Sequence, residues 1–194
     1  MNSKWYIPDT TFYMQEYAES ETGGCSIDGV PSFEWKIKRA SELFANKRVV
    51  IFALPGAFTP TCSSQQLPGF DIHAELFAEH GVDEVWCTAV NDAFVMRSWE
   101  VDQQLRNVKM LPDGNGDFAK GMDMLVDKRN LGFGMRSWRY AMVVNNCEVE
   151  YMAAENGWSS DLAPADPYEV STPEAILSYL SGTPATDDQM ELDF

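Results

Sequence analysis

Residues 49–62 read VVIFALPGAFTPTC, and this stretch decides the fold. Its first six residues form a nearly continuous apolar, β-prone run, which is typical of a central strand buried on both faces. Pro55 ends the run and starts a turn. Thr59 is a favoured N-cap residue and Pro60 a favoured first helical residue, so a helix is predicted to begin there. Cys62 then stands at the third helical position.

The segments around this stretch alternate between strand and helix patterns. Apolar runs at 84–90 and 140–144 predict two further buried strands, and the second continues through a turn into 148–152 as a hairpin. Helical periodicity with capping signals predicts helices within 70–81, 92–105 and 172–182. This order predicts an α/β domain of three layers, α/β/α, with a central mixed sheet.

The chain has 194 residues, which suits one domain, and we expect that domain to span 1–182. Residues 1–30 are polar and turn-rich, with a loop expected at 19–24. The tail 183–194 is acidic and short of core residues, so it is expected to be disordered. No apolar stretch is long enough to span a bilayer, and the N-terminus lacks the apolar segment of a secretory signal.

The chain is strongly acidic. Fourteen Lys and Arg against thirty Asp and Glu give a net charge of −16. Such a chain is repelled by phosphate backbones and anionic lipid, so nucleic-acid binding and membrane-surface binding are not expected.

The cysteines are too dispersed for a metal site. None belongs to a C-x-x-C pair, and the chain has only two histidines, so no structural zinc is expected. Scattered cysteines without a secretory signal indicate reduced thiols in the cytoplasm. Three of them have a simple structural interpretation, as a loop residue, a packed strand residue and a hairpin-tip residue: Cys25, Cys87 and Cys147.

Cys62 differs from the other cysteines in its predicted position. The first-turn N–H groups of a helix have no intrahelical partner, and the helix dipole is positive at this end. Both effects favour a thiolate over a thiol. The residue also follows the carboxyl end of a strand, where active sites form in open α/β sheets. The alternative interpretation is that Cys62 is one more small buried apolar residue.

A reactive thiolate needs a positive charge nearby, and arginine suits this because it is always charged and presents several donors. Arg136 and Arg139 both stand where the strand at 140–144 begins. The spacing alone does not decide between these two residues.

Together these residues resemble the peroxiredoxins, in particular the plant type II enzymes and the animal peroxiredoxin five. The family motif Pro-x-x-x-Thr-x-x-Cys is present as Pro55, Thr59 and Cys62. The resemblance covers residues 7–180 and is most similar to bacterial glutathione-using members. Some of those carry a fused glutaredoxin domain, which is not expected here. Further matching strings lie at 67–70, 90–96, 111–116 and 132–144.

The resemblance implies a thioredoxin-like fold and the reduction of hydrogen peroxide and alkyl hydroperoxides. Cys62 matches the peroxidatic cysteine, whose thiolate becomes a sulfenic acid. Thr59 matches the residue whose hydroxyl bonds both thiolate and peroxide, and Pro55 matches the one that shields the cysteine. Arg139 matches the arginine that holds the thiolate and polarises the peroxide. The backbone N–H groups of Thr61 and Cys62 would complete the anion site.

One departure from the family bears on how the enzyme is recycled. The animal members carry a resolving cysteine near the C-terminus, and residues 153–180 contain none. Cys87 matches the second cysteine of plant type II members, which is not generally needed for turnover. The resemblance therefore implies a one-cysteine mechanism in a homodimer, with glutathione as co-substrate, glutaredoxin as partner and no cofactor.

Three alternatives remain open at this point. The first is a two-cysteine peroxidase that uses Cys87 and thioredoxin, although a Cys62–Cys87 disulfide would need local unfolding of a buried strand. The second is a redox-sensing protein that passes its oxidation to client proteins. The third is a binding protein of the same fold with an inert thiol at position 62.

Overall fold

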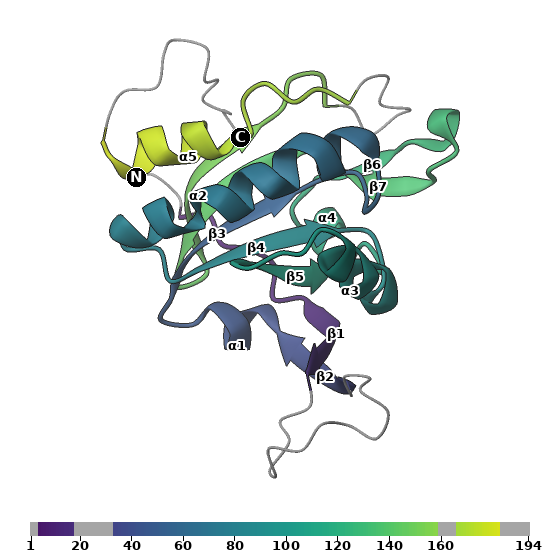
Figure 1. Cartoon of the computed structure of the whole chain (residues 1–194), viewed down its shortest axis with the longest axis horizontal. Helices are drawn as coiled ribbons and strands as arrows, with labels where there is room; N and C mark the ends of the chain where they lie inside the picture. The colour runs from purple at the N-terminus through teal and green to yellow at the C-terminus, as the bar shows by residue number, and fades with distance from the viewer. Residues whose placement is uncertain (1–3, 18–32, 159–165, 183–194) are drawn as a thin grey trace.

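The computed structural model describes residues 4–17, 33–158 and 166–182 (Figure 1). The loop expected at 19–24, Cys25 and the tail 183–194 lie outside these residues, and a single domain over 1–182 remains a prediction. Among the described residues, no helix is long and apolar enough to cross a membrane.

A five-stranded mixed sheet forms the middle of the molecule, with strand order β5-β4-β3-β8-β9 (Figure 1). The strands β3, β4 and β5 run parallel, whereas β8 pairs antiparallel with both β3 and β9. This arrangement confirms the predicted α/β fold with a mixed sheet. The bounds are β3 Arg48–Ala53, β4 Glu84–Ala89, β5 Val108–Pro112, β8 Tyr140–Asn145 and β9 Glu148–Ala154.

Three helices pack in the apolar cluster on one face of the sheet: α2 Leu67–Glu79, α3 Ala93–Asp102 and α5 Pro173–Leu180. The Phe52 ring of β3 stacks on Phe70 of α2 with centroids 4.1 Å apart. Two predicted caps are present. The side chain of Asp92 accepts a hydrogen bond from the Val95 N–H, and that of Thr172 accepts one from the Ala175 N–H.

The opposite face is covered by an antiparallel pair of strands and two short helices, with bounds β1 Thr11–Tyr17, β2 Phe33–Arg39, α1 Ala40–Phe44 and α4 Asp117–Gly121. The strand at 11–17 lies within the segment that was expected to be polar and turn-rich, and it was not predicted. Phe12 and Met14 are buried while Tyr13 between them is half exposed, which is the alternation of a strand with one covered face. This alternation of apolar residues spans too few positions to predict a strand in a polar segment.

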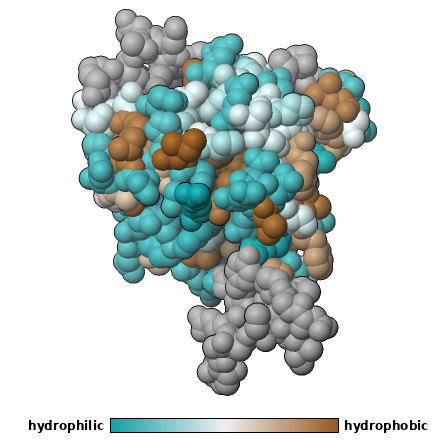
Figure 2. Space-filling view, viewed as in Figure 1, coloured by the Kyte–Doolittle hydropathy of each residue, from teal (hydrophilic) through white to brown (hydrophobic). Residues whose placement is uncertain are grey.

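The remaining elements lie at the edge where the parallel strands end. They are the π-helical turn η1 Cys62–Gln66, the strand pair β6 Leu125–Asp127 and β7 Met135–Ser137, and the 3₁₀ turn η2 Arg129–Leu131. The surface is mostly polar, with separate apolar patches (Figure 2). Three aromatic side chains are more than half exposed near this edge: Trp35, at 55%, Phe58, at 53%, and Phe94, at 58%.

Two helical glycines give opposite expectations for the same substitution. A Cβ on Gly121 would lie 2.7 Å from the Pro8 Cβ, so Gly121→Ala should lower the free energy of unfolding by about 1–3 kcal/mol through overpacking. A Cβ on Gly69, inside α2, would lie 3.4 Å from the Pro173 Cγ. Gly69→Ala should therefore be neutral or raise stability by up to about 1 kcal/mol. Urea denaturation of the pair measures this, and equal effects would contradict it.

Candidate active site

A tight turn joins β3 to the next helix and carries the candidate nucleophile. Pro55 and Gly56 are buried in it, and Phe58 adopts a left-handed conformation with φ +62°. The Thr59 hydroxyl donates a hydrogen bond of 2.9 Å to the Gly56 carbonyl. The side-chain amide oxygen of Asn91 accepts one of 3.0 Å from the Ala57 N–H. The conformation of the turn is thus stabilised by a hydrogen bond within it and by another from the loop after β4.

The helix begins where the sequence predicts it. Pro60 and Thr61 are helical, and the Ser63 N–H donates to the Thr59 carbonyl at 3.0 Å. Thr59 therefore stands at the N-cap position, but its hydroxyl bonds the turn instead of a first-turn N–H. From Cys62 to Gln66 the helix widens into a π turn, a feature that occurs frequently at functional sites.

Cys62 lies against a buried arginine. The thiol is fully buried, and Arg139, just before β8, places its Nη1 3.5 Å from the Cys62 Sγ. The same Nη1 donates to the Gln66 Oε1 at 2.5 Å, and Nη2 donates to the Asp166 Oδ2 at 2.6 Å. Because a guanidinium is always charged, the sulfur faces a fixed positive charge that is held in place from two other directions.

The two candidate arginines make different contacts. Arg136 uses its Nε to donate to the Phe133 carbonyl and its Nη1 to donate to the Val90 carbonyl, at 2.9 and 3.1 Å. Its Nη1 also lies 3.2 Å from the place that a Cβ on Gly56 would occupy. Arg136 therefore supports the outer side of the turn, and of the two it is Arg139 that reaches Cys62.

Three residues of this site were not found from the sequence. Gln66 lies one helical turn after Cys62, a spacing that places the two side chains next to each other on a helix. That spacing was the one sequence signal for Gln66. Lys128, between β6 and η2, and Asp166, ahead of α5, are distant in sequence from Cys62. Only the fold brings their charges to the arginine.

Cys87 packs behind the site and stays a thiol. It is fully buried in β4, within the same apolar cluster as Cys62. Burial raises the pKa of Cys87 well above its ordinary value, and the charge of the neighbouring Cys62 acts in the same direction, while Arg139 opposes them. A neutral, enclosed thiol is a poor nucleophile.

Cys147 lies at the other end of the sheet. It follows β8 in the hairpin turn, beside the start of β3, whereas Cys62 follows the end of β3. Six strand residues separate the two ends, which corresponds to about 17–20 Å. Cys147 therefore cannot reach Cys62 within one chain without a large rearrangement.

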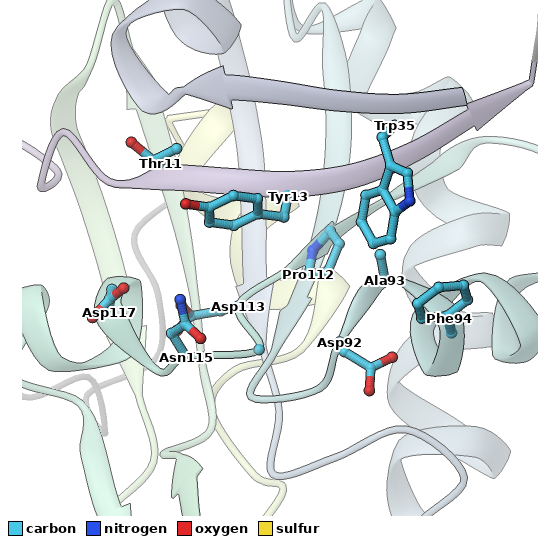
Figure 3. A pocket seen from close by; sticks show the side chains of 11 residues that line it. Thr11, Tyr13, Trp35, Asp92, Ala93, Phe94, Pro112, Asp113, Asn115 and Asp117 are labelled. Atoms are coloured by element: carbon cyan, nitrogen blue, oxygen red, sulfur yellow. The ribbon is translucent and has the colours of Figure 1, made fainter. Parts of the chain in front are cut away.

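A pocket of about 430 Å³ opens at the carboxyl ends of β4 and β5 (Figure 3). Tyr13 and Trp35 project into it from the β1–β2 pair, opposite Phe94. Two of its carboxylates already have partners, since Asp92 caps α3 and Asp113 accepts the Phe118 and Ala119 N–H groups. Cys62 does not line this pocket, so it is separate from the cysteine–arginine pair.

In the described part of the chain, no group of three or more His, Cys, Asp or Glu side chains could hold a metal ion.

A mixed sheet of thioredoxin type, with a buried cysteine in the first turn of a helix and an arginine on its sulfur, defines a thiol redox protein. The Redoxin family profile matches residues 36–166, in agreement with this class. A peroxiredoxin of Rhizobium etli is 50% identical over 180 residues, which cover 93% of this chain and 97% of that protein. Peroxiredoxin-2D of Arabidopsis thaliana is 39% identical over 137 residues, 70% of this chain and 80% of that one.

Solved structures lead to the same family. The crystal structure of the Plasmodium falciparum antioxidant protein, a 1-Cys peroxiredoxin, superposes with a TM-score of 0.82 at 32% identity, covering 93% of this chain and 99% of that one. The chain belongs to the peroxiredoxin family and is of the type II, peroxiredoxin-five kind. It is accordingly a peroxidase and an oxidoreductase that acts on peroxides.

Proposed function

We propose that Cys62 is the peroxidatic cysteine of a one-cysteine peroxiredoxin that glutathione and glutaredoxin recycle. The observation that carries the proposal is the 3.5 Å contact between the Cys62 Sγ and the Arg139 Nη1, both of which belong to fully buried side chains. The thiolate attacks one peroxide oxygen, so that an S–O bond forms while the O–O bond breaks. The leaving hydroxide or alkoxide takes up the proton that the thiol released on ionising, and sulfur is oxidised to a sulfenic acid.

The other residues of the turn are proposed to shape this step. Pro55 shields the thiol from water, and the N–H groups of Thr61 and Cys62 face the anion at the helix start. In the resting structure the Thr59 hydroxyl donates to the Gly56 carbonyl. Its proton must therefore turn away from Gly56 before Thr59 can donate to the thiolate, whereas the hydroxyl oxygen can accept a hydrogen bond from the peroxide in the present arrangement.

The recycling route follows from where the other cysteines lie. Cys87 is enclosed in β4 and Cys147 is at the far end of the sheet, so neither described thiol is placed to attack a sulfenic acid on Cys62. A small thiol can enter instead. Glutathione displaces the sulfenic oxygen as water and leaves a mixed disulfide, which a second glutathione or a glutaredoxin thiol reduces.

Cys87→Ser tests this route. We expect the variant to keep peroxide consumption within about twofold of wild type, because Cys87 is packed as core and does not take part in turnover. Glutathione with glutaredoxin should support both proteins, and thioredoxin should support neither. Since a buried hydroxyl costs about 1–3 kcal/mol, Cys87→Ala serves as the apolar counterpart. Loss of activity in both variants, with turnover on thioredoxin, would make Cys87 a resolving cysteine.

We further propose that the enzyme is a cytoplasmic homodimer. The exposed rings of Phe58 and Phe94 lie at the edge that carries the active-site turn, and apolar aromatic residues there suit an interface between two copies. Sedimentation equilibrium measures the mass, and a monomer at micromolar concentration would contradict the dimer.

A further inference from the structure

Glu155 is a buried carboxylate next to Arg139. It follows the last residue of β9 and is only 3% exposed. Its backbone is bonded on both sides, since the Glu155 N–H donates to the Arg139 carbonyl at 3.1 Å and the Glu155 carbonyl accepts from the Trp138 Nε1 at 2.8 Å. A buried carboxylate is costly unless hydrogen bonds replace its water, so the partners of its side chain are of interest.

One oxygen of this carboxylate accepts four hydrogen bonds. Oε1 accepts from the successive backbone N–H groups of Glu169, Val170 and Ser171, at 2.9, 3.0 and 2.8 Å. The Ser171 hydroxyl donates to the same oxygen at 2.7 Å. The donors lie 14–16 residues after Glu155, so one side chain joins the beginning and the end of the connection between β9 and α5. Because hydrogen bonds to a carboxylate are about twice as strong as those between neutral groups, the end of this connection is held firmly.

The segment that Glu155 holds carries two side chains that lie against Arg139. The Asp166 Oδ2 accepts from the Arg139 Nη2 at 2.6 Å, and the centre of the Tyr168 ring lies 5.6 Å from the guanidinium carbon. Tyr168 directly precedes Glu169, the first of the N–H donors. Glu155 thus bonds the backbone of Arg139 with its own backbone and, with its side chain, the segment that lies against the Arg139 side chain.

The direction of the guanidinium depends on this segment. Arg139 places its Nη1 3.5 Å from the Cys62 Sγ, at the far end of a long side chain. That end is held by the π turn, through Gln66, and by the segment 166–171. A shift of about 1 Å in a group that acts on the reacting atoms can cost about 10²-fold in rate. A displacement of the segment should therefore be measurable as a loss of reactivity.

We propose that Glu155 is a positioning residue of this peroxidase: by tying the segment 166–171 to the backbone of Arg139, it keeps the guanidinium directed at the Cys62 sulfur. The inference rests on the proposed role of Cys62. The role requires a hydrogen-bond acceptor at the place of the Glu155 Oε1, and the charge of the carboxylate is secondary to it. Among the described residues, the other oxygen, Oε2, accepts no hydrogen bond, so an amide nitrogen in its place would disrupt none.

Two substitutions at position 155 separate the place of the acceptor from its charge. Glu155→Gln removes the charge and keeps an oxygen where Oε1 stands. Glu155→Asp keeps the charge and withdraws the oxygens by one bond length, about 1.5 Å, which is too far for the N–H groups. We expect the rate constant for hydrogen peroxide, measured by stopped flow above the pH at which the thiolate forms, to stay within about threefold of wild type in E155Q. In E155D it should fall at least about tenfold.

The pH at which the thiolate forms is a second readout. A guanidinium that has moved away from the sulfur stabilises the thiolate less, so E155D should form it at a pH about one unit higher than wild type. E155Q should form it at the wild-type pH or slightly below, because the loss of a negative charge does not oppose a thiolate. The ultraviolet absorbance of the thiolate, followed from about pH 4 to pH 9, measures both. A mere loss of stability would leave this readout unchanged.

Asp71 of α2 provides a matched control in another part of the fold. Its Oδ1 accepts from the successive backbone N–H groups of Arg106, Asn107 and Val108 at 3.2, 2.8 and 3.0 Å. These donors lead into the amino end of β5, whereas the active-site turn follows the carboxyl end of the parallel strand β3. D71E should therefore lower the midpoint of urea denaturation, as E155D does, and leave the rate and the pH profile unchanged.

The order of the two variants at position 155 decides the inference. A fast E155D beside a slow E155Q would assign the effect to charge, and equal rates in both would assign it to neither property, so either result overturns the inference. If E155D does not fold, Ser171→Ala still removes one of the four donors and should lower the rate about threefold. A wild-type rate in S171A would then overturn the inference. A wild type that does not react with peroxide at all would instead refute the proposed function.

Discussion

Cys62→Ser is expected to lower the rate constant for peroxide reduction by more than about 10³-fold, because a serine hydroxyl stays protonated and is a weak nucleophile toward peroxide oxygen. The substitution changes one atom of a fully buried side chain, so the Arg139 guanidinium keeps its other partners, Gln66 and Asp166. Competition kinetics or stopped flow with hydrogen peroxide measures the loss.

The control for this variant must separate chemistry from folding. A buried hydroxyl in an apolar cluster costs about 1–3 kcal/mol, so urea denaturation should accompany the kinetics. Cys147→Ser replaces a partly exposed hairpin cysteine and should keep wild-type activity. A folded Cys62→Ser variant with more than a tenth of the wild-type rate would assign the reaction to another group and return Cys62 to a packing role.

The central strands and the long helices follow from the sequence because their patterns are local. The run at 49–54 is apolar on both faces, and β3 is buried on both. The helix patterns carried caps, so α3 and α5 begin where expected. The edge strand β5 was not predicted, because Lys109 and Pro112 interrupt a run of only five residues. The pair β1–β2 was missed because residues 18–32 separate its two strands in the sequence. Their pairing therefore cannot be predicted from a local sequence pattern.

The residues of the site also fall into two groups, those that local sequence patterns predict and those that only the fold brings together. Cys62 could be placed by local rules, since an N-cap threonine and a proline mark the helix start. Choosing Arg139 over Arg136 required the family resemblance, because the two differ by three residues in one short segment. Gln66, Lys128 and Asp166 meet around Arg139 through contacts between distant elements, and burial of a lysine has no sequence signature. The charges of Lys128 and Asp166 come close to each other only in the folded chain.

Arg139→Lys is expected to lower the rate of peroxide reduction by about 10²-fold while keeping the positive charge. The guanidinium spans three groups at once, with Nη1 on the Cys62 Sγ and the Gln66 Oε1 and Nη2 on the Asp166 Oδ2. A lysine ammonium is a single point charge on a flexible stem and cannot hold this fork. The loss should appear in the reaction with peroxide and not in the later reduction by glutathione.

Arg136→Lys is the matched control, since Arg136 supports the same turn through the Val90 and Phe133 carbonyls without reaching the sulfur. Arg136→Lys should lower the rate of peroxide reduction by less than about tenfold, because Arg136 supports the turn and does not contact the reacting atoms. Equal losses in the two variants would mean that both arginines serve only to hold the turn. A loss confined to Arg139→Lys would show that peroxide reduction depends on where a fixed guanidinium points, because both variants carry the same net charge.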